Sequence, residues 1–515
     1  MSLLQLSQRL SLKQKQQFAS SELSFWASEF VTLEHGGPLS FVKHPYLIDV
    51  YQDRHPRLVF IKATQVGLST FSALKVIHGC IYRYPLGAIY FFPTDSAISS
   101  FSRSRIAPLI ENNPDSIGKY VEDTDAISLK KIGKSFLYLK GMGTRLAVLS
   151  VPADVIVMDE LDSADPELMT MARKRLSASA FKEEVYLSNP SIPGYGIDLL
   201  FQDSDQKHWL LKCPHCGEWN CVDETFPDCL LKERGTVILA CKKCRKELDK
   251  SKGEWVAKIP SNKTASGYRF SQLFSPTVSA SEIYNEYTKA KVNGQLTVFF
   301  NMTLGRSYVT AREKLEPEAI LAACSTEFPD DPFAGGGVSC GIDQGKNLHC
   351  TFKKRVGKKI FTWFIILTSF EDLDEYIEKC DRAVIDALPE TRLARELAER
   401  FPGKVFLNFY VSGVKDAVKW DEDKMIVQEN RTQALDAEHA MWVDGVNVLP
   451  PRSPEVEEFA QHISNVAKKI EEDPETGSKR WIWIHTGPDH FAHSDSYSLI
   501  ALNEITETGG ELNYV

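Results

Sequence analysis

Two apolar segments that end in polar turns constrain the fold of this chain more than any other feature. The first, at residues 58–70, runs from Leu-Val-Phe-Ile-Lys into Ala-Thr-Gln-Val-Gly-Leu-Ser-Thr. The second, at residues 155–160, reads Val-Ile-Val-Met-Asp-Glu and delivers two adjacent carboxylates. A P-loop nucleotidase is built in this way, from a strand entering a glycine- and hydroxyl-bearing turn and a later strand ending in acids. The order of the two segments predicts an ATPase with a parallel-type sheet.

The phosphate loop departs from its usual form, G-x-x-x-x-G-K-[ST]. That form would place a lysine where the chain has Leu68, and the cation stands instead at the opening of the loop, at Lys62. Backbone amides and the following helix N-terminus favour phosphate whichever end supplies the ammonium. An ordinary strand and turn is the alternative for this segment alone. The expected nucleotide-binding residues here are Lys62, Gln65, Gly67, Leu68, Ser69 and Thr70.

The acidic strand end makes the nucleotidase interpretation stronger. Four apolar residues precede Asp159 and Glu160, as in a buried parallel strand. In an ATPase, one such acid coordinates Mg²⁺ and the other orients the hydrolytic water. Two acids that complement a helix dipole are the alternative. Both motifs in the right order favour ATP hydrolysis, with Asp159 as the metal-coordinating acid and Glu160 as the catalytic one.

Length and charge limit the remaining possibilities. A chain of 515 residues exceeds what one core usually organises, so we expect two or three domains. The net charge of −9 argues against a protein that coats nucleic acid through bulk positive charge, although local basic runs leave DNA binding open. The sequence shows neither a signal segment nor an apolar stretch long enough to span a bilayer, so we expect a cytoplasmic protein without a membrane partner.

Two cysteine pairs predict a structural zinc site. Cys213-Pro-His-Cys216 and Cys241-Lys-Lys-Cys244 are C-x-x-C turns separated by 24 residues. Each turn can direct two thiolates at one ion, and four thiolates close a tetrahedral Zn²⁺ site without a position for substrate. His215, Cys221 and Cys229 are nearby alternatives as ligands.

A second acidic constellation follows a Pro- and Gly-rich stretch at residues 328–337, which we interpret as an interdomain linker. Beyond it, Asp343 and Asp386 each end an apolar strand, and Asp489 and Asp495 lie at the start of a late helix. Acids gathered from separate strands and a late helix predict an RNase H-like α/β domain that holds two Mg²⁺ or Mn²⁺ ions. Turn or helix-cap carboxylates are the alternative for each acid taken alone. His490 and His493 are either metal ligands or structural histidines.

These parts occur in a recognisable order, together with Leu187-Ser-Asn-Pro-Ser191 and Asn301-Met-Thr-Leu-Gly305. The chain resembles the large terminase subunit of tailed bacteriophages, in particular the lambda-like branch with a zinc-ribbon insertion. The resemblance implies an ATP-driven motor that moves double-stranded DNA into a procapsid and a nuclease that cuts concatemeric DNA. It also implies a small terminase subunit, a portal and a ring of copies as partners, in the cytoplasm of the bacterial host.

The resemblance implies roles for further residues. Asn189 would sense the γ-phosphate, and Tyr46 would stack on the adenine. The family commonly has an arginine in the phosphate loop where this chain has Gln65, so another cation is needed, with Arg145, Arg173 and Arg175 as candidates. In the nuclease, Asp343, Asp386 and Asp495 would hold metal, and the choice between Asp489 and Asp495 as the third acid stays open.

The predicted organisation is an α/β multidomain chain. A helicase-like DNA-translocating ATPase with a non-catalytic C-terminal docking domain is the main alternative, and a binding protein with a vestigial ATP site is another. The predicted segments are a helical N-terminus (1–40), the P-loop ATPase core (41–204), the zinc ribbon (205–260), a connecting helical region (261–327), the linker (328–337), the RNase H-like nuclease (338–505) and a C-terminal tail (506–515).

Overall fold

The chain forms two compact units. The computed structural model describes residues 7–122, 126–149, 151–233, 235–310, 313–411, 418–472 and 479–508. The first unit ends at Tyr308 and the second begins at Val309. Residues 328–337, predicted as the linker, therefore lie inside the second unit, and helix α13 (Pro317–Leu321) before them already packs on that unit's α17 (Pro454–Ser464). Most of the predicted tail, residues 509–515, lies outside the described residues.

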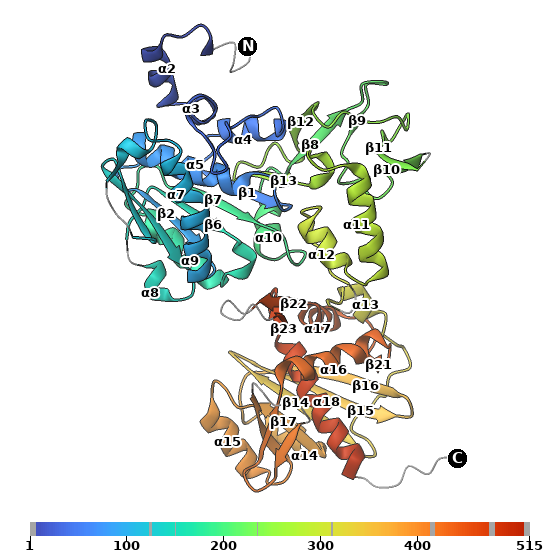
Figure 1. Ribbon diagram of the computed structural model, residues 1–515. Coiled ribbons are helices and arrows are strands. Elements are labelled where there is room, and N and C mark those ends of the chain that lie inside the picture. The colour runs from blue at the N-terminus through green and yellow to red at the C-terminus, as the bar shows by residue number, and fades with distance from the viewer. Residues whose placement is uncertain are drawn as a thin grey trace. The chain divides into compact units, whose positions relative to one another are not determined.

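An eleven-stranded mixed sheet forms the centre of the first unit (Figure 1). Its main path runs in the order β12-β8-β13-β1-β7-β6-β2-β5-β4-β3, and β9 pairs with β8. The strands from β8 to β5 along this path run parallel to their neighbours, whereas β12, β9, β4 and β3 are antiparallel. The strand bounds are β1 Arg57–Lys62, β2 Ala88–Phe92, β3 Val121–Glu122, β4 Leu129–Ile132, β5 Ser135–Gly141, β6 Val155–Asp159, β7 Glu183–Ser188, β8 Lys207–Lys212, β9 Trp219–Asn220, β12 Gly253–Ala257 and β13 Ser266–Phe270.

Both faces of this sheet are buried, as expected for a mostly parallel sheet. Leu58 and Phe60 of β1 lie in one apolar core, whereas Val59 and Ile61 lie in the other, because successive side chains point to opposite faces. The larger core also includes Trp26, so the N-terminal segment packs on the sheet of the first unit. The helices of this unit are α2 Leu12–Ala19, α3 Leu23–Phe30, α4 Ile48–Gln52, α5 Leu68–Tyr82, α6 Asp95–Phe101, α7 Ala107–Glu111, α8 Arg145–Val148, α9 Pro166–Arg173, α10 Gly196–Gln202, α11 Ala280–Val292 and α12 Leu296–Met302.

The segment predicted as a separate zinc ribbon is continuous with the main sheet. Its first strand β8 and its last strand β12 extend that sheet, and only the β10 (Leu230–Glu233) and β11 (Thr236–Leu239) pair forms a sheet of its own. The predicted helical connection after the ribbon also contributes β13, which lies between β1 and β8. The segment is therefore an insertion between strands of the first unit's sheet.

The second unit contains an eight-stranded sheet in the order β19-β20-β18-β17-β14-β15-β16-β21 (Figure 1). Strands β14, β15 and β16 form an antiparallel meander, and β17, β18 and β20 continue parallel to β14. The bounds are β14 Val338–Gln344, β15 Leu348–Val356, β16 Lys359–Leu367, β17 Arg382–Asp386, β18 Val405–Tyr410, β19 Lys419–Asp421, β20 Ile426–Glu429, β21 Asn447–Val448, and for a separate hairpin β22 Val466–Glu472 and β23 Lys479–His485.

The last helix, α18 (His490–Thr508), lies directly on strands β14, β15 and β17. A glycine makes this approach possible, since a Cβ atom at Gly341 would lie 1.9 Å from the carbonyl oxygen of Ser494. The remaining helices are α14 Leu373–Lys379, α15 Thr391–Arg400 and α16 Arg431–Val443. Among the described residues, no helix combines the length and apolar character needed to cross a membrane.

Candidate functional sites

Three strand ends meet in the first unit. Strand β7 lies between β1 and β6, with Ile61 opposite Ser188 and Leu187 opposite Asp159. The residues that follow these strands therefore converge at one edge of the sheet. The Lys62 Nζ lies 3.0 Å from the Glu160 Oε1 and 3.5 Å from the Asn189 Oδ1, and the Asn189 Nδ2 donates to the Lys62 carbonyl over 2.8 Å. Segments far apart in sequence thus supply one cation, two acids and an amide to a single site.

The loop between β1 and α5 has the backbone of a tight turn. Gln65 and Gly67 adopt positive φ angles of 59° and 87°, and Gly67 is the N-cap of the fifteen-residue helix α5. No side chain caps this N-terminus. The amides of the first helical turn therefore have no capping side chain, an arrangement suited to an anion. The Leu68 side chain is buried in the core, so only its backbone can face a ligand.

Opposite charges hold this site together. Burial lowers the pKa of Lys62, but Glu160 and Asp159 outweigh this effect and raise the pKa above its ordinary value. Burial likewise raises the pKa of Asp159, while Lys62 opposes the shift. The Tyr90 hydroxyl donates to the Asp159 Oδ2 over 2.8 Å. Glu160 has a half-exposed side chain and a φ of 52°, so the sheet holds it in a strained left-handed conformation facing solvent.

A second cation reaches the first turn of α5, and the sequence did not predict it. Arg105, from a π-helical turn at Ser102–Ile106, donates to the Thr70 Oγ1 over 2.6 Å and to the Glu34 Oε1 over 2.7 Å. It is also near enough to Lys62 to oppose the rise in its pKa. No local motif marks Arg105, because it approaches the loop from a separate helix.

The three arginines predicted for this role contact other groups. Arg145 pairs with Glu167, the Arg173 Nε lies 3.3 Å from the Glu184 Oε1, and the Arg175 Nη1 donates to the Leu149 carbonyl over 2.7 Å. Arg145 remains largely exposed in its pair. None of these contacts is with the phosphate loop.

The surroundings of Tyr46 do not favour its predicted contact with adenine. Its side chain is fully buried among Trp209, Phe270 and Phe274. Its hydroxyl lies 2.7 Å from the His44 Nδ1, and burial raises its pKa to about 12. A ring packed on these aromatic neighbours offers no free face to a nucleobase.

The four predicted zinc ligands form one group. The ligand atoms of Cys213, Cys216, Cys241 and Cys244 all lie within 4.8 Å of one another, with Sγ–Sγ distances of 3.6 Å for Cys213–Cys244 and 3.7 Å for Cys216–Cys241. Burial raises the pKa of the Cys241 thiol, but backbone amides of Cys244 and Lys243 and the neighbouring thiols lower it to about 6. The donor set fits a tetrahedral four-thiolate zinc site. The alternatives His215, Cys221 and Cys229 are not in this group.

Acids also converge in the second unit. Asp343 and Asp386 end the adjacent parallel strands β14 and β17, and α18 begins beside them. The His490 Nδ1 lies 2.8 Å from the Asp343 Oδ2, and the Tyr497 hydroxyl donates to the Asp386 Oδ2 over 3.2 Å. The His493 Nε2 lies 3.4 Å from the Asp489 Oδ2. Of the two candidates for the third acid, Asp489 is the one at this edge of the sheet.

The charges here suit a cation. Burial raises the pKa of Asp386, and the neighbouring Asp343 raises it further. A hydrogen bond to Asp343 raises the pKa of His490. His349, opposite Asp343 in the β14–β15 register, belongs to the same possible metal-binding group as Asp343 and His490. The alternating pattern of the β14–β15 hairpin could have indicated His349.

Asp495 is placed elsewhere, and the expectation that it holds the nuclease metal is not supported by its surroundings. Its carboxylate is fully buried, lies 2.8 Å from the Lys353 Nζ and accepts a hydrogen bond of 3.0 Å from the Trp442 Nε1. Helix phase explains the difference. His490, His493 and Tyr497 share the face of α18 toward the acids, whereas Asp495 is about 140° around the helix from His490.

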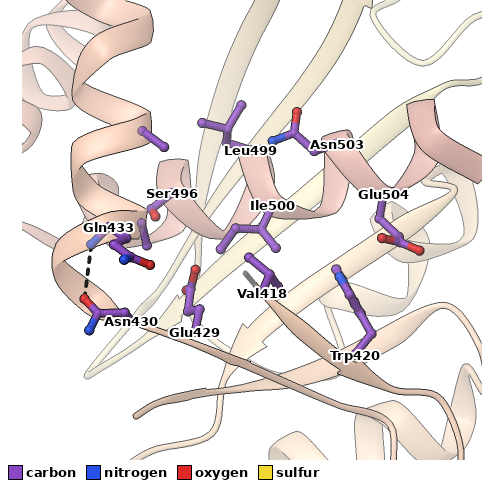
Figure 2. Close-up of a pocket in the computed structure, with 12 residues that line it drawn as sticks. Val418, Trp420, Glu429, Asn430, Gln433, Ser496, Leu499, Ile500, Asn503 and Glu504 are labelled. Atoms are coloured by element: carbon purple, nitrogen blue, oxygen red, sulfur yellow. Dashed lines mark hydrogen bonds between the residues drawn. The ribbon is translucent and has the colours of Figure 1, made fainter. Parts of the chain in front are cut away.

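A cavity of about 370 Å³ lies along a further face of α18. Figure 2 shows Ser496, Leu499, Ile500 and Asn503 of α18 along this cavity, with Glu429 of β20 below them. Burial raises the pKa of Glu429 to about 8, although Asn408 opposes the shift. This cavity is therefore separate from the face that carries His490 and His493.

Comparison with known proteins relates the part of the chain that carries the first of these sites to a protein family. Residues 35–259 match the family described as the phage terminase large subunit gpA, ATPase domain. The matched range includes Lys62, Asp159, Glu160 and the cysteine group. The large terminase subunit of Enterobacteria phage P21 is 25% identical over 334 residues, covering 56% of this chain and 52% of that protein. The predicted resemblance to large terminase subunits is confirmed. The chain spans about half the length of this curated terminase relative.

Solved terminase structures also align with the chain. The large terminase of a thermophilic bacteriophage is 12% identical, covers 87% of this chain and 93% of its own, and gives a TM-score of 0.32. Further structures of that terminase are complexes with ADP and with ATP-gamma-S. The ATPase domain of the Thermus phage P74-26 large terminase is 11% identical, covers 54% of this chain and 96% of its own, and gives a TM-score of 0.33.

Proposed function

We propose that this chain is a DNA-packaging motor that hydrolyses ATP to move double-stranded DNA into a procapsid and cuts concatemeric DNA with a metal-dependent endonuclease. The observation that carries the ATPase half is the contact of Lys62 with Glu160 and Asn189 beside an uncapped helix N-terminus. The match of residues 35–259 to a terminase ATPase domain supports the same assignment.

In the nucleotide site, Lys62 and the amides of the first turn of α5 bind the phosphates. Asp159 and the Ser69 hydroxyl are the groups that would hold Mg²⁺, which supplies charge neutralisation of the phosphates. Glu160 orients the attacking water when phosphate draws Lys62 away from it. The Lys62 Nζ lies 3.5 Å from the Asn189 Oδ1, so a movement of the ammonium would change a contact with the segment after β7 directly.

The four cysteines would hold Zn²⁺ in a structural role, because four thiolates leave no open coordination position. This ion would fix the two C-x-x-C turns of the insertion against each other. The ATP chemistry does not depend on it.

In the second unit we propose an RNase H-like nuclease. Asp343, Asp386 and Asp489 are the acids that would hold Mg²⁺ or Mn²⁺, with His490 and His493 beside them. Metal ions there would activate water and stabilise the leaving oxygen of the cut strand. Asp495 does not take part in metal binding in this proposal, and its ion pair with Lys353 joins α18 to β15.

The proposed partners are double-stranded DNA, a small terminase subunit and the portal of the procapsid. Several copies of the chain would form a ring on that portal, in the cytoplasm of the bacterial host. The resemblance to large terminase subunits is the support for these partners.

Plasmid cleavage with Mg²⁺ or Mn²⁺ and ATP turnover, measured in parallel, test the two halves of this proposal. We expect Asp386→Asn to lose cleavage alone and Glu160→Ala to lose ATP turnover alone. Asp444→Asn, at an exposed acid, serves as the matched control. If no metal or DNA form gives cleavage that depends on Asp386, the nuclease assignment fails and the helicase-like ATPase with a docking domain replaces it. ATP turnover that survives Glu160→Ala would reject the ATPase assignment.

A further inference from the structure

A second group of possible metal ligands lies at the base of the ribbon insertion. His208 is on β8, and Cys221 and Asp223 follow the short strand β9. Leu211 pairs with Asn220 in the antiparallel β8–β9 ladder, so continuing this register brings residue 223 opposite His208. The ligand atoms of these three residues lie within 4.8 Å of one another, and the Cys221 Sγ lies 3.8 Å from the His208 Nδ1. One donor comes from the ATPase sheet and two come from the insertion.

The carboxylate of Asp223 is unexplained by its neighbours. Both oxygens are buried, and neither makes a hydrogen bond of acceptable geometry with a residue in the described part of the chain. A buried carboxylate in this condition costs free energy unless something compensates it. Burial raises the pKa of Asp223 to about 6, although Arg269 and Ser271 lower it. A cation bound by the carboxylate oxygens would remove this cost.

Two of the nearby cations, Arg269 and Lys258, contact other groups. The Arg269 Nη2 lies 3.8 Å from the Asp198 Oδ1, and its guanidinium lies over the Phe201 ring, 5.1 Å from the centroid. Lys258 pairs with Glu224. Arg306 lines the same cavity, and both arginines lower the pKa of Asp223, but neither donates a hydrogen bond to its carboxylate. Both carboxylate oxygens therefore remain open to a bound cation.

We propose that His208, Cys221 and Asp223 bind a second Zn²⁺ ion, separate from the four-cysteine site. Nitrogen, sulfur and carboxylate oxygen are the donors that zinc takes in proteins, and three protein ligands leave one position open. His208 and Asp223 also line a cavity of about 320 Å³, which gives the ion an entry path and room for water as the fourth ligand. The ion would tie the start of the insertion to strand β8.

The formal charge of the donor set also suits this ion. With a thiolate, a carboxylate and Zn²⁺, the group has no net charge, which suits its buried position.

The zinc content of the full chain, purified without a histidine tag or chelator and measured by elemental analysis, tests this proposal. We expect two zinc ions per chain in the wild type and one in Cys221→Ser. Asp223→Asn, which preserves side-chain size, should also retain one. Cys229→Ala is the matched control, since this buried thiol of the same insertion lies outside both groups, and it should retain two.

Cys216→Ser separates the two sites. If both exist, this variant also retains one ion, whereas the double variant Cys216→Ser with Asp223→Asn retains none. A wild-type protein with one ion or none, or with two ions that both survive Cys221→Ser and Asp223→Asn, would overturn the second site. This count is independent of ATP turnover and DNA cleavage, so it stands or falls apart from the proposed function.

Discussion

Each unit of the chain pairs a buried lysine on a strand with a carboxylate, but the two pairs differ in exposure. In the first unit, the Lys62 side chain is 8% exposed while its partner Glu160 is 50% exposed. In the second unit, Lys353 and Asp495 are both 0% exposed. The first pair lies at a sheet edge beside a helix N-terminus, whereas the second is enclosed between the sheet, α16 and α18. Because Glu160 is exposed, a ligand can displace the contact between Lys62 and Glu160. The contact between Lys353 and Asp495 is enclosed, so a ligand cannot approach it.

The two proposed sites also have opposite electrostatic character. The nucleotide site places Lys62 and Arg105 around an uncapped helix N-terminus, which favours an anion. The nuclease site gathers Asp343, Asp386 and Asp489, and the lysine of that unit is held on another face by Asp495. The charge of Lys353 is thus compensated by Asp495, away from the acids proposed to hold metal.

The largest expected effect comes from breaking the enclosed pair. Lys353→Met leaves Asp495 as an uncompensated buried charge, so we expect a loss of about 3–5 kcal/mol in the free energy of unfolding. Denaturant titration of the full chain, followed by tryptophan fluorescence because Trp442 contacts Asp495, measures it. Lys353→Met combined with Asp495→Asn should recover part of the loss, since no charge is left unpaired. If Asp495→Asn instead abolished cleavage at unchanged stability, Asp495 would be a metal ligand after all.

For the exposed pair, Lys62 and Glu160, we expect a large loss of activity and a small loss of stability. Lys62→Met removes the cation that binds phosphate, and we expect ATP turnover to fall by about 100- to 1,000-fold. The unfolding midpoint should move far less than in Lys353→Met, because Glu160 remains in contact with water. Steady-state hydrolysis and denaturant titration on the same preparations measure both, with the exposed Lys119→Met as the control. An equal loss of stability in Lys62→Met and Lys353→Met would remove the distinction between the pairs.

Local patterns were sufficient for the strands that carry these sites. The apolar runs before Lys62 and Asp159 predicted buried strands β1 and β6, and the strands ending at Asp343 and Asp386 were predicted in the same way. Paired cysteines predicted the four-thiolate group. Such features depend on residues that are near in sequence, so composition and spacing reveal them.

Sequence patterns gave less guidance on side chains whose surroundings come from distant segments. Tyr46 is covered by aromatic residues of β8 and β13, and nothing near position 46 indicates this. Asp495 required the phase of α18 against the sheet, which spacing from Asp489 alone did not fix. Arg105 reaches Thr70 only because an irregular π-helical turn points it toward the loop. Strand β13 lies in the region 261–327, which was predicted as a helical connection.

The charge contrast between the sites can be sharpened at Arg105. Arg105→Ala removes a charged hydrogen bond to Thr70 and a cation beside the phosphate loop, so we expect kcat/KM for ATP to fall by about tenfold or more. Arg103→Ala, two residues earlier and exposed, is the matched control and should leave kcat/KM unchanged. Equal values for the wild type and Arg105→Ala would mean that Lys62 and the backbone amides supply the phosphate site without this arginine.

The smallest expected effect concerns Glu429, a buried acid without a lysine partner, and the pH dependence of stability. No lysine or arginine among the described residues pairs with Glu429, and burial raises its pKa to about 8. Its folded state therefore keeps a proton that the unfolded chain releases above its ordinary pKa of 4.5. Stability should fall as pH rises from about 5 to 8, by up to about 1.4 kcal/mol per pH unit.

Glu429→Gln removes this titration, so the variant should gain stability over the wild type as pH rises and lose that advantage toward pH 5. Denaturant midpoints at pH 5, 6, 7 and 8 measure the difference, with the exposed Glu378→Gln as the control. Parallel pH profiles for wild type and Glu429→Gln would show that Glu429 is already ionised and compensated. Profiles that diverge as pH rises would establish that Glu429, which has no lysine partner of the kind that Asp495 has in Lys353, stays protonated in the folded state.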